Sequence, residues 1–194
     1  MASLNAVHPF PVEAGQGLRL ELVGASVADE WLELVERNLE RLARWEPWAG
    51  LPQNLSGIRL FLAWQAQSFV AGTSVPLQIR LDGVLVGSCS ARIDKTEGTA
   101  EIGYWIDAAA EGRGIASRSV GALVGYLLER GDIGRIQART AADNARSRAL
   151  LERLGLEFEG VLRSSQRING GRADMAMYAL VAEAGGPSLQ PLVE

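Results

Sequence analysis

The sequence contains little of the residue types that build disulfides, metal centres and histidine-based catalysis. It has 194 residues, with one cysteine, Cys89, one histidine, His8, and one lysine, Lys95. A single cysteine excludes an internal disulfide and a zinc site built from several cysteines. Cys89 stands among small residues without a neighbouring histidine, which favours a packed thiol over a nucleophile. His8 lies in an irregular lead-in, which argues against a histidine base.

Long apolar runs and an excess of positive charge are also lacking. No run is long enough to span a bilayer, and no signal-peptide pattern is present, so we expect a cytoplasmic protein without membrane contact. The net charge of −4 argues against general nucleic-acid binding. Hydrophobic residues make up 47% and charged residues 22%, which is typical of a soluble globular protein.

The chain length and the periodicity of its apolar residues predict one domain. We expect an irregular lead-in over 1–16, a single domain over 17–184 and a loosely ordered tail over 185–194. Strand patterns cover 18–22, 75–81, 85–91, 99–106, 133–140, 156–162 and 175–181. Helical spacing covers about 26–45, 58–69, 115–130 and 144–154, with Ser26 and Asp29 as a weak capping box.

The order of these elements predicts an α/β fold with a mixed sheet. Asp82-Gly83 is a strong hairpin signal, and Asn169-Gly170-Gly171 marks a second turn between strands. Strands joined by such turns pair antiparallel. A strand–helix–strand crossover in the second half requires a parallel pair.

The segment 111–116, EGRGIA, lies between a strand and a helix. The first N–H groups of a helix lack internal partners and carry partial positive charge. Gly112 and Gly114 remove side chains that would keep a ligand from the backbone, and Arg113 adds a cation. The turn therefore predicts a site for a phosphate or pyrophosphate over residues 112–118.

Two other glycine-rich phosphate motifs fit the sequence poorly. A dinucleotide fingerprint belongs in the first of several strand–helix–strand units and needs an acidic residue at the end of the next strand. Here antiparallel strands come first, and the next strand ends in Thr140. No Gly-Lys-Ser/Thr sequence is present, so a Walker A loop is excluded.

The element order and four sequence blocks resemble the GNAT acetyltransferase superfamily, in particular its RimJ/RimL-like branch. The glycine turn resembles the family's Gln/Arg-x-x-Gly-x-Gly/Ala motif, with Glu111 at its first position. The other blocks are 38–48 (NLERLARWEPW), 100–105 (AEIGYW), and 144–147 (NARS) with 154–160 (LGLEFEG), followed by Asp174 and Tyr178. The resemblance covers about residues 17–182.

The resemblance implies a GNAT fold: a mostly antiparallel central sheet, a parallel splay between its fourth and fifth strands, and flanking helices. It implies acetyl-CoA as cosubstrate, no metal, and direct acetyl transfer to a protein N-terminus or a small amine. The pyrophosphate would meet the backbone of the glycine turn, and the pantetheine arm would add to the fourth strand. The implied cofactor-binding residues are Gly103, Tyr104, Trp105, Ile106, Gly112, Arg113, Gly114, Ile115, Ala116, Ser117, Asn144 and Ser147.

For catalysis, the resemblance points to Glu101, Ser147 and a backbone N–H near Trp105. Glu101 occupies the position of a carboxylate base in several family members, and the alternative is a salt-bridged strand residue. Other members carry a tyrosine as the acid for the thiolate, where this chain has Leu151. Ser147 lies one helical turn beyond Asn144 and can hydrogen-bond the sulfur. Asn144 is either a pantetheine ligand or a helix cap.

A different class of function stays open: a catalytically silent acetyl-CoA sensor or interaction subunit. This alternative stays open because position 151 is a leucine and not the tyrosine that other family members use as the acid. The segment Trp45–Trp48 is expected to line either the acceptor cleft or a homodimer face, and the sequence does not choose between them.

Overall fold

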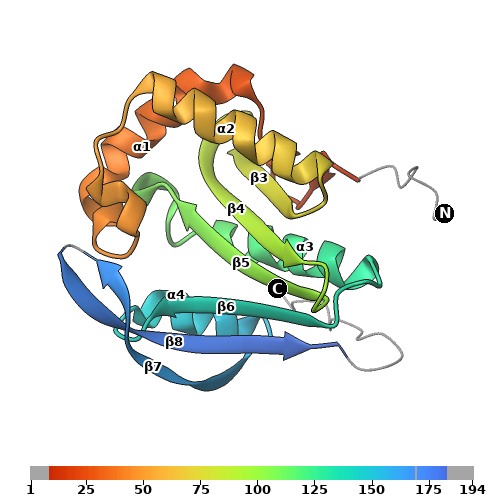
Figure 1. Cartoon of the computed structure of the whole chain (residues 1–194). Coiled ribbons are helices and arrows are strands. Elements are labelled where there is room, and N and C mark those ends of the chain that lie inside the picture. Colours follow the sequence, from red (N-terminus) through yellow and green to blue (C-terminus); the bar gives the residue numbers. More distant parts are fainter. Residues whose placement is uncertain (1–8, 169, 183–194) are drawn as a thin grey trace.

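The computed structural model describes residues 9–168 and 170–182, which form one eight-stranded sheet around which the helices pack (Figure 1). Its strand order is β1-β2-β3-β4-β5-β6-β8-β7. Among the described strands only β5 and β6 pair in parallel, which confirms the mixed sheet. The strands are β1 (Val12–Glu13), β2 (Leu18–Leu22), β3 (Ser74–Leu81), β4 (Val84–Asp94), β5 (Thr99–Ile106), β6 (Arg135–Ala141), β7 (Glu157–Ile168) and β8 (Gly171–Val181).

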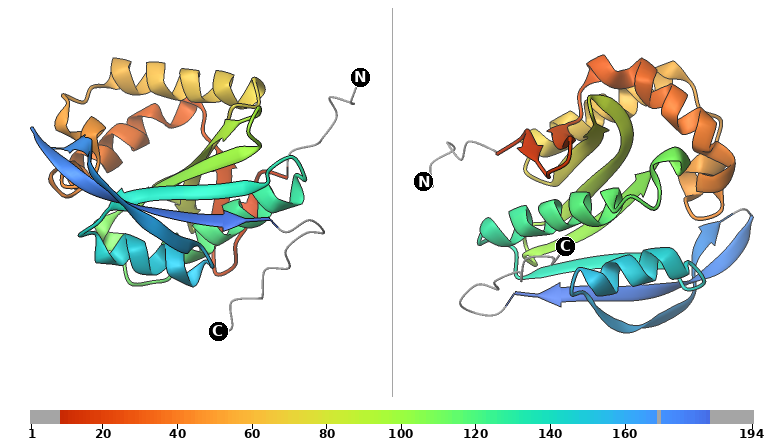
Figure 2. Two further views of the ribbon diagram at one scale, coloured as in Figure 1. Left: turned by 60° about the horizontal axis from the view of Figure 1, so that its bottom comes forward. Right: turned by 180° about the vertical axis from the view of Figure 1, so that it is seen from behind.

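Four α-helices within the described ranges cover the two faces of the sheet (Figure 2). Helices α1 (Ala28–Ala43) and α2 (Leu55–Val70) lie on one face, and α3 (Ile115–Glu129) and α4 (Ala145–Arg153) lie on the other. The larger core cluster lies between the sheet and α3 and α4, and a second cluster joins α1 and α2 to Leu85 and Trp105. Residues of β5 therefore alternate between the two clusters, as the pleat of a strand requires.

The start of α1 differs from the expected capping box. Residues Ala25–Val27 form a short 3₁₀ turn, and α1 begins at Ala28 without a side-chain cap. In α2 the cap is Asn54, whose Oδ1 accepts a hydrogen bond of 2.9 Å from the N–H of Gly57. The short turns η2 (Pro47–Gly50) and η3 (Ala108–Ala110) complete the connections.

Residues 9–16 of the lead-in, and the strands of the last hairpin, contain more regular structure than the sequence predicted. Within residues 1–16, Val12 pairs with Leu20 in β1, and the ring of Phe10 lies 4.9 Å from that of Tyr126. The last two strands run to 12 and 11 residues, well beyond 156–162 and 175–181. β7 lies at the sheet edge and most of its residues are exposed, so apolar alternation does not mark its length.

Three sequence expectations concern residues outside the described ranges. They are the rejection of His8 as a base, the loose tail over 185–194, and the position of Asn169 in the last turn. The single domain over 17–184 stays a prediction. None of the helices in the described ranges is long and apolar enough to cross a membrane.

The parallel pair β5–β6 opens part of the way along its length. These two strands are the fourth and fifth of the sequence prediction. Pairing extends from Thr99 with Arg135 to Ile102 with Ala138, and stops there. Beyond this point β6 continues to pair with β8 as far as Ala141, and β5 continues to pair with β4. The two strands diverge towards that end (Figure 1), which leaves one edge of Gly103–Ile106 without a strand partner.

Candidate active site

A cleft of about 1420 Å³ lies where β5 and β6 separate. Its walls come from β5, the turn before α3 and the first turn of α3, β6, α4, and the end of α1 with the segment that follows it. β7 and β8 add one residue each. The structure brings nearly all the predicted site residues into this cleft, and Arg113 is the exception. Those that line it are Glu101, Gly103, Tyr104, Trp105, Ile106, Gly112, Gly114, Ile115, Ala116, Ser117, Asn144 and Ser147.

The glycine turn has the backbone that an anion site needs. Gly112 and Gly114 adopt φ values of +75° and +68°, which side chains rarely allow. Gly114 occupies the N-cap position of α3 and has no side chain that could accept a hydrogen bond. The first N–H groups of α3 therefore have no side-chain cap, and they lie at the end of the cleft. A Cβ at either glycine would meet nothing within 4 Å, so the backbone angle, and not crowding, requires glycine here.

The open edge of β5 presents alternate backbone groups. The N–H of Asp107 donates to the carbonyl of Val86, at 2.7 Å. Because antiparallel strands alternate their hydrogen bonds, the N–H groups of Trp105 and Gly103 also point to β4, and those of Tyr104 and Ile106 point to the open edge. The free donors near Trp105 are therefore the amides on either side of it.

Tyr104 and Ser147 meet across the opening. Their hydroxyl oxygens are 2.8 Å apart, and Ser147 comes from the first turn of α4. The Oδ1 of Asn144 accepts from the N–H of Ser147 at 3.2 Å, so Asn144 is the N-cap of α4. Burial raises the pKa of Tyr104 to about 12, against the smaller opposing effects of Ser147 and Arg153, so this phenol stays protonated near neutrality.

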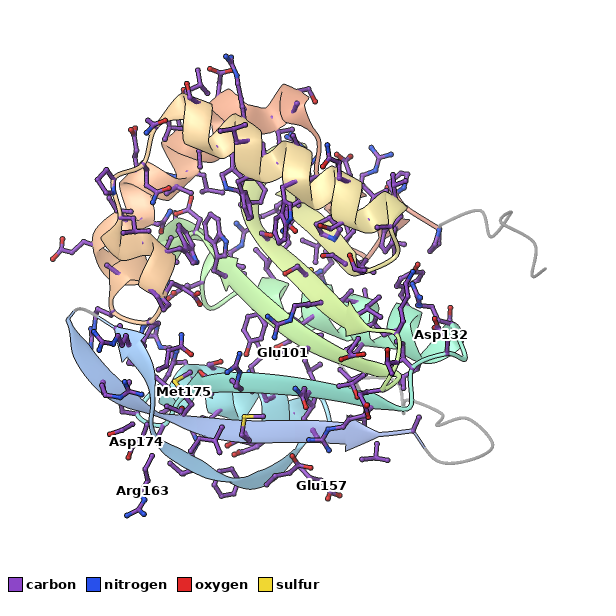
Figure 3. All side chains as sticks on the ribbon, in the orientation of Figure 1. Glu101, Asp132, Glu157, Arg163, Asp174 and Met175 are labelled. Carbon is purple, nitrogen blue, oxygen red and sulfur yellow. The ribbon has the colours of Figure 1, made fainter. Side chains whose placement is uncertain are left out.

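Glu101 is held between two arginines. Its Oε2 accepts from Arg92 at 2.6 Å, and its Oε1 accepts from Arg139 at 2.9 Å. Figure 3 shows Glu101 on β5 and Met175, another lining residue, on β8. The geometry matches the salt-bridged alternative, and the role of Glu101 as a base stays a prediction.

A partly buried polar network fixes α1 to the end of β5. Asp107 accepts from Arg37 at 2.7 and 2.9 Å and from Asn38 at 3.1 Å. Asn38 in turn accepts from the N–H of Ala108 at 2.9 Å. Burial would raise the pKa of Asp107, but the hydrogen bonds from Arg37, Asn38 and the N–H of Ala109 hold that pKa below its ordinary value.

Arg41 extends this network into the cleft. It donates to Asn38 at 3.1 Å and to the carbonyl of Ile106, and it pairs with Glu111 at 2.7 Å. Glu111 also pairs with Arg146 of α4 at 2.5 Å. The glycine turn is thus connected to α1 on one side and to α4 on the other.

Aromatic rings line the cleft on the side of α1. Trp105 packs at 6.0 Å from Trp31 and at 6.2 Å from Trp48, measured between ring centroids. Trp45 and Glu46 line the cleft beside them. Trp48 donates from Nε1 to Glu46 at 3.1 Å. The segment therefore contributes Trp45 and Glu46 to the cleft, and its role at the acceptor or in a homodimer face stays a prediction.

Other residues singled out in the sequence have structural roles. Cys89 is buried, and burial raises the pKa of its thiol to about 12, which fits a packed thiol. Tyr178 is buried; it donates to Glu152 at 2.8 Å and accepts from Arg148 at 2.9 Å. Asp174 accepts from the N–H of Ser164 at 2.7 Å and so fastens β7 to β8. Over the described ranges no three His, Cys, Asp or Glu side chains gather as a metal site would need.

Sequence reasoning missed several residues of the cleft. Arg41 and Glu46 lie within the 38–48 block. The spacing of apolar residues in that block predicts a helix, but it does not indicate which polar side chains reach the cleft. Arg139, Gln166 and Met175 come from β6, β7 and β8, and only the curvature of the sheet brings them there.

A mixed sheet that opens at the parallel pair β5–β6, with a glycine turn at the start of the helix behind it, is the architecture of acyl-CoA-binding acetyltransferases. The acetyltransferase (GNAT) domain family matches residues 19–157, and the chain belongs to that family.

Relatives of known structure or name cover nearly the whole chain. The ribosomal-protein-serine acetyltransferase of Escherichia coli (strain K12) is 25% identical over 174 residues, 89% of this chain and 97% of the relative. RimL, a ribosomal L7/L12 alpha-N-protein acetyltransferase solved with coenzyme A, superposes with a TM-score of 0.85 at 26% identity, covering 88% of this chain and 97% of RimL. The microcin C7 self-immunity acetyltransferase MccE, solved with acetyl-CoA and AMP, also gives 0.85 at 26% identity, covering 89% and 97%.

Proposed function

We propose that the chain is an acetyl-CoA-dependent N-acetyltransferase that moves acetyl directly to a primary amine, the α-amine of a protein N-terminus, as on a ribosomal protein. One observation carries this proposal: the open edge of β5, the glycine turn and Ser147 all line the same cleft. Together they supply the three kinds of contact that a thioester on a phosphate-bearing carrier requires.

The donor fits this cleft by the chemistry of its parts. The pyrophosphate would accept from the N–H groups of residues 112–117 at the start of α3, with the exposed Arg113 nearby. The pantetheine amides would pair with the open edge of Gly103–Ile106 as an added strand does. Asn144 caps α4 and lines the same wall, so its amide side chain is within the cleft as well.

Transfer needs a neutral amine and a polarised thioester. The amide N–H of Tyr104 or Ile106 would polarise the thioester carbonyl as an oxyanion donor does. Ser147 would hydrogen-bond the sulfur as the thiolate leaves. Glu101, the base that the sequence suggests, would have to exchange a hydrogen bond from Arg92 or Arg139 before it could accept a proton.

An α-amine suits this site better than a lysine side chain. Its ordinary pKa lies near neutrality, whereas that of lysine is about 10.4, so far more of the α-amine is neutral at pH 7. The relatives named for ribosomal-protein acetylation support a protein acceptor. With a ribosomal protein as the acceptor, we expect the protein to act in the cytoplasm.

A peptide panel tests the acceptor. Peptides with Ala or Ser first and an internal lysine are incubated with acetyl-CoA, and mass spectrometry locates the added acetyl group. We expect acetylation at the α-amine and none at lysine. No CoA release with any amine would support the acetyl-CoA sensor instead.

A second candidate acceptor is a small-molecule amine. The likeness to MccE, solved with acetyl-CoA and AMP, equals the likeness to RimL in TM-score. Acetylation of polyamines or aminoglycosides without any peptide product would move the chain to this branch and leave the donor site unchanged.

A further inference from the structure

Four carboxylates line the cleft, and their partners differ. Glu101 is paired with Arg92 and Arg139, and Glu111 is paired with Arg41 and Arg146. Asp143 is exposed, before the start of α4. Glu46 is partly buried and has no arginine or lysine partner within the described ranges.

The Glu46 carboxylate is held in place with one oxygen left free. Its backbone N–H donates to the carbonyl of Leu42 at 2.8 Å, and its carbonyl accepts from Ala49 at 3.1 Å, so the backbone is fixed at the end of α1. Its Oε2 accepts from the indole N–H of Trp48 at 3.1 Å. Its Oε1 accepts no hydrogen bond from any described residue. A partly buried carboxylate oxygen without a donor is ready for a cationic ligand.

The surroundings favour a cation at this point. Trp48 packs on Trp105, so the carboxylate lies against an apolar wall where attraction between charges is weakly screened. Three of the cleft's arginines, Arg41, Arg139 and Arg146, are already paired with Glu111 or Glu101.

The other charged groups of the cleft are Arg44, over the ring of Trp45, and the exposed Arg153 and Asp143 of the α4 segment. β7 and β8 contribute the uncharged Gln166 and Met175.

We propose that Glu46 binds the α-ammonium of the acceptor and accepts its proton, so that the anionic subsite of the cleft lies at the Trp45–Trp48 segment. This inference rests on the proposed function and names the group that selects an amine within it. Burial raises the pKa of Glu46 above its ordinary value, in spite of the hydrogen bond from Trp48, which acts in the opposite direction. This shift brings the pKa of the Glu46 carboxyl closer to the pKa of the α-amine. A smaller difference between the two pKa values makes proton transfer between the groups easier.

The transfer balances in protons and electrons. One proton passes from the ammonium to Glu46, and the nitrogen lone pair that it leaves forms a C–N bond to the thioester carbonyl. As the C–S bond breaks, its electron pair leaves with sulfur. The second proton of the nitrogen ends on the CoA thiol, and Glu46 returns its proton to solvent.

The test compares Glu46→Gln with Glu101→Gln, because both keep the shape of a cleft carboxylate and remove its charge. Steady-state rates are measured with a Ser-first peptide over a range of pH, with Glu129→Gln, exposed on α3, as a control outside the cleft. For Glu46→Gln we expect kcat/KM to fall by about 10²- to 10⁴-fold at neutral pH, and the deficit to shrink as pH rises and the free amine becomes neutral. Glu101→Gln should lose less, and its deficit should not depend on pH.

Binding gives a second readout that folding alone would not change. Glu46→Gln should bind the free peptide more weakly than the wild type does and the N-acetylated peptide equally well, with unchanged stabilisation by CoA. Glu46→Asp should recover part of the rate.

The two proposals fail in different ways. Wild-type rates for Glu46→Gln, or a pH-dependent loss in Glu101→Gln alone, would overturn the role of Glu46. If the wild type acetylates only a small amine, the proposed acceptor is wrong, and the same comparison with that amine decides whether Glu46 is its base.

Discussion

The hydroxyl groups of Tyr104 and Ser147 lie 2.8 Å apart and connect β5 to α4 across the point where the sheet opens. The Tyr104 oxygen also lies 3.3 Å from the backbone carbonyl of Ser147. Since the raised pKa of Tyr104 keeps it protonated, it can donate to Ser147 Oγ and leave the serine proton free for another acceptor. Position 151 on α4 is a leucine where other family members carry a tyrosine, and Tyr104 supplies a phenol to the same cleft from β5 instead.

Ser147→Ala should slow acetyl transfer by roughly ten- to a thousandfold, because one hydrogen bond to the developing thiolate is lost in the transition state. The affinity for CoA should change little, since the glycine turn and the β5 edge are untouched. Single-turnover rates together with CoA titration separate the two effects.

Tyr104→Phe is the matched variant, since it keeps the partly buried ring and removes only the hydroxyl. We expect a smaller loss than in Ser147→Ala, and no further loss when the two changes are combined, because both act on one hydrogen bond. Full turnover in both single variants would show that solvent or the backbone protonates the thiolate.

Gly114→Val should abolish the stabilisation of the protein by CoA. Valine disfavours the φ of +68° that Gly114 adopts, so the N–H groups at the start of α3 would turn away from the pyrophosphate. Thermal melts with and without CoA measure this, because a ligand stabilises the state that it binds. Arg113→Ala, which leaves the backbone donors in place, should retain most of the shift. An unchanged CoA shift in Gly114→Val would remove the phosphate site from this turn.

The sequence predicted most of the core strands and the donor site because both depend on local signals. The periodicity of apolar residues predicted β2 to β6. Gly112 and Gly114 predicted the turn because both adopt a positive φ, which glycine allows without any contact from distant residues. The acceptor side depends on contacts between residues far apart. The pairing of Arg139 with Glu101, and the position of Glu46 beside Trp48 and Trp105, follow from how the sheet opens.

Asp107→Asn should lower the free energy of unfolding by about 1–3 kcal/mol at neutral pH, because the buried carboxylate accepts charged hydrogen bonds that an amide replaces poorly. Its folded pKa lies below the ordinary value, so this contribution is present above the unfolded pKa and is lost as the pH falls towards the folded pKa. Chemical denaturation from neutral to acid pH measures it.

The matched control is Asp132→Asn. Asp132 also pairs with an arginine, Arg130 at 2.7 Å, but its side chain is 55% exposed, and such pairs contribute less than about 1 kcal/mol. The difference between wild type and Asp107→Asn should shrink below about pH 4, where the unfolded carboxyl becomes protonated. A difference that persisted undiminished into acid would show that the shape of the network, and not its charge, stabilises the end of β5.

Glu111 stands directly before the glycine turn and pairs with two arginines beside it. Its Oε1 accepts from Arg41 at 2.7 Å, and its Oε2 accepts from Arg146 at 2.5 Å. The side chain of Arg146 is 86% exposed. The related family motif carries glutamine or arginine at this position. A carboxylate here repels an incoming pyrophosphate and at the same time occupies the cations that would attract it.

Glu111→Gln should therefore tighten CoA binding by about two- to tenfold at low salt, as expected for removal of one unit charge several ångströms from a phosphate in a solvated site. The gain should fade between about 0.05 and 0.5 M salt, since exposed charges are screened over a shorter distance as ionic strength rises. Calorimetric titration of CoA at the two salt concentrations measures both effects. Arg146→Ala should act in the opposite direction. Weaker CoA binding by Glu111→Gln at every salt concentration would mean that the two ion pairs shape the turn, and that their geometric role outweighs the repulsion.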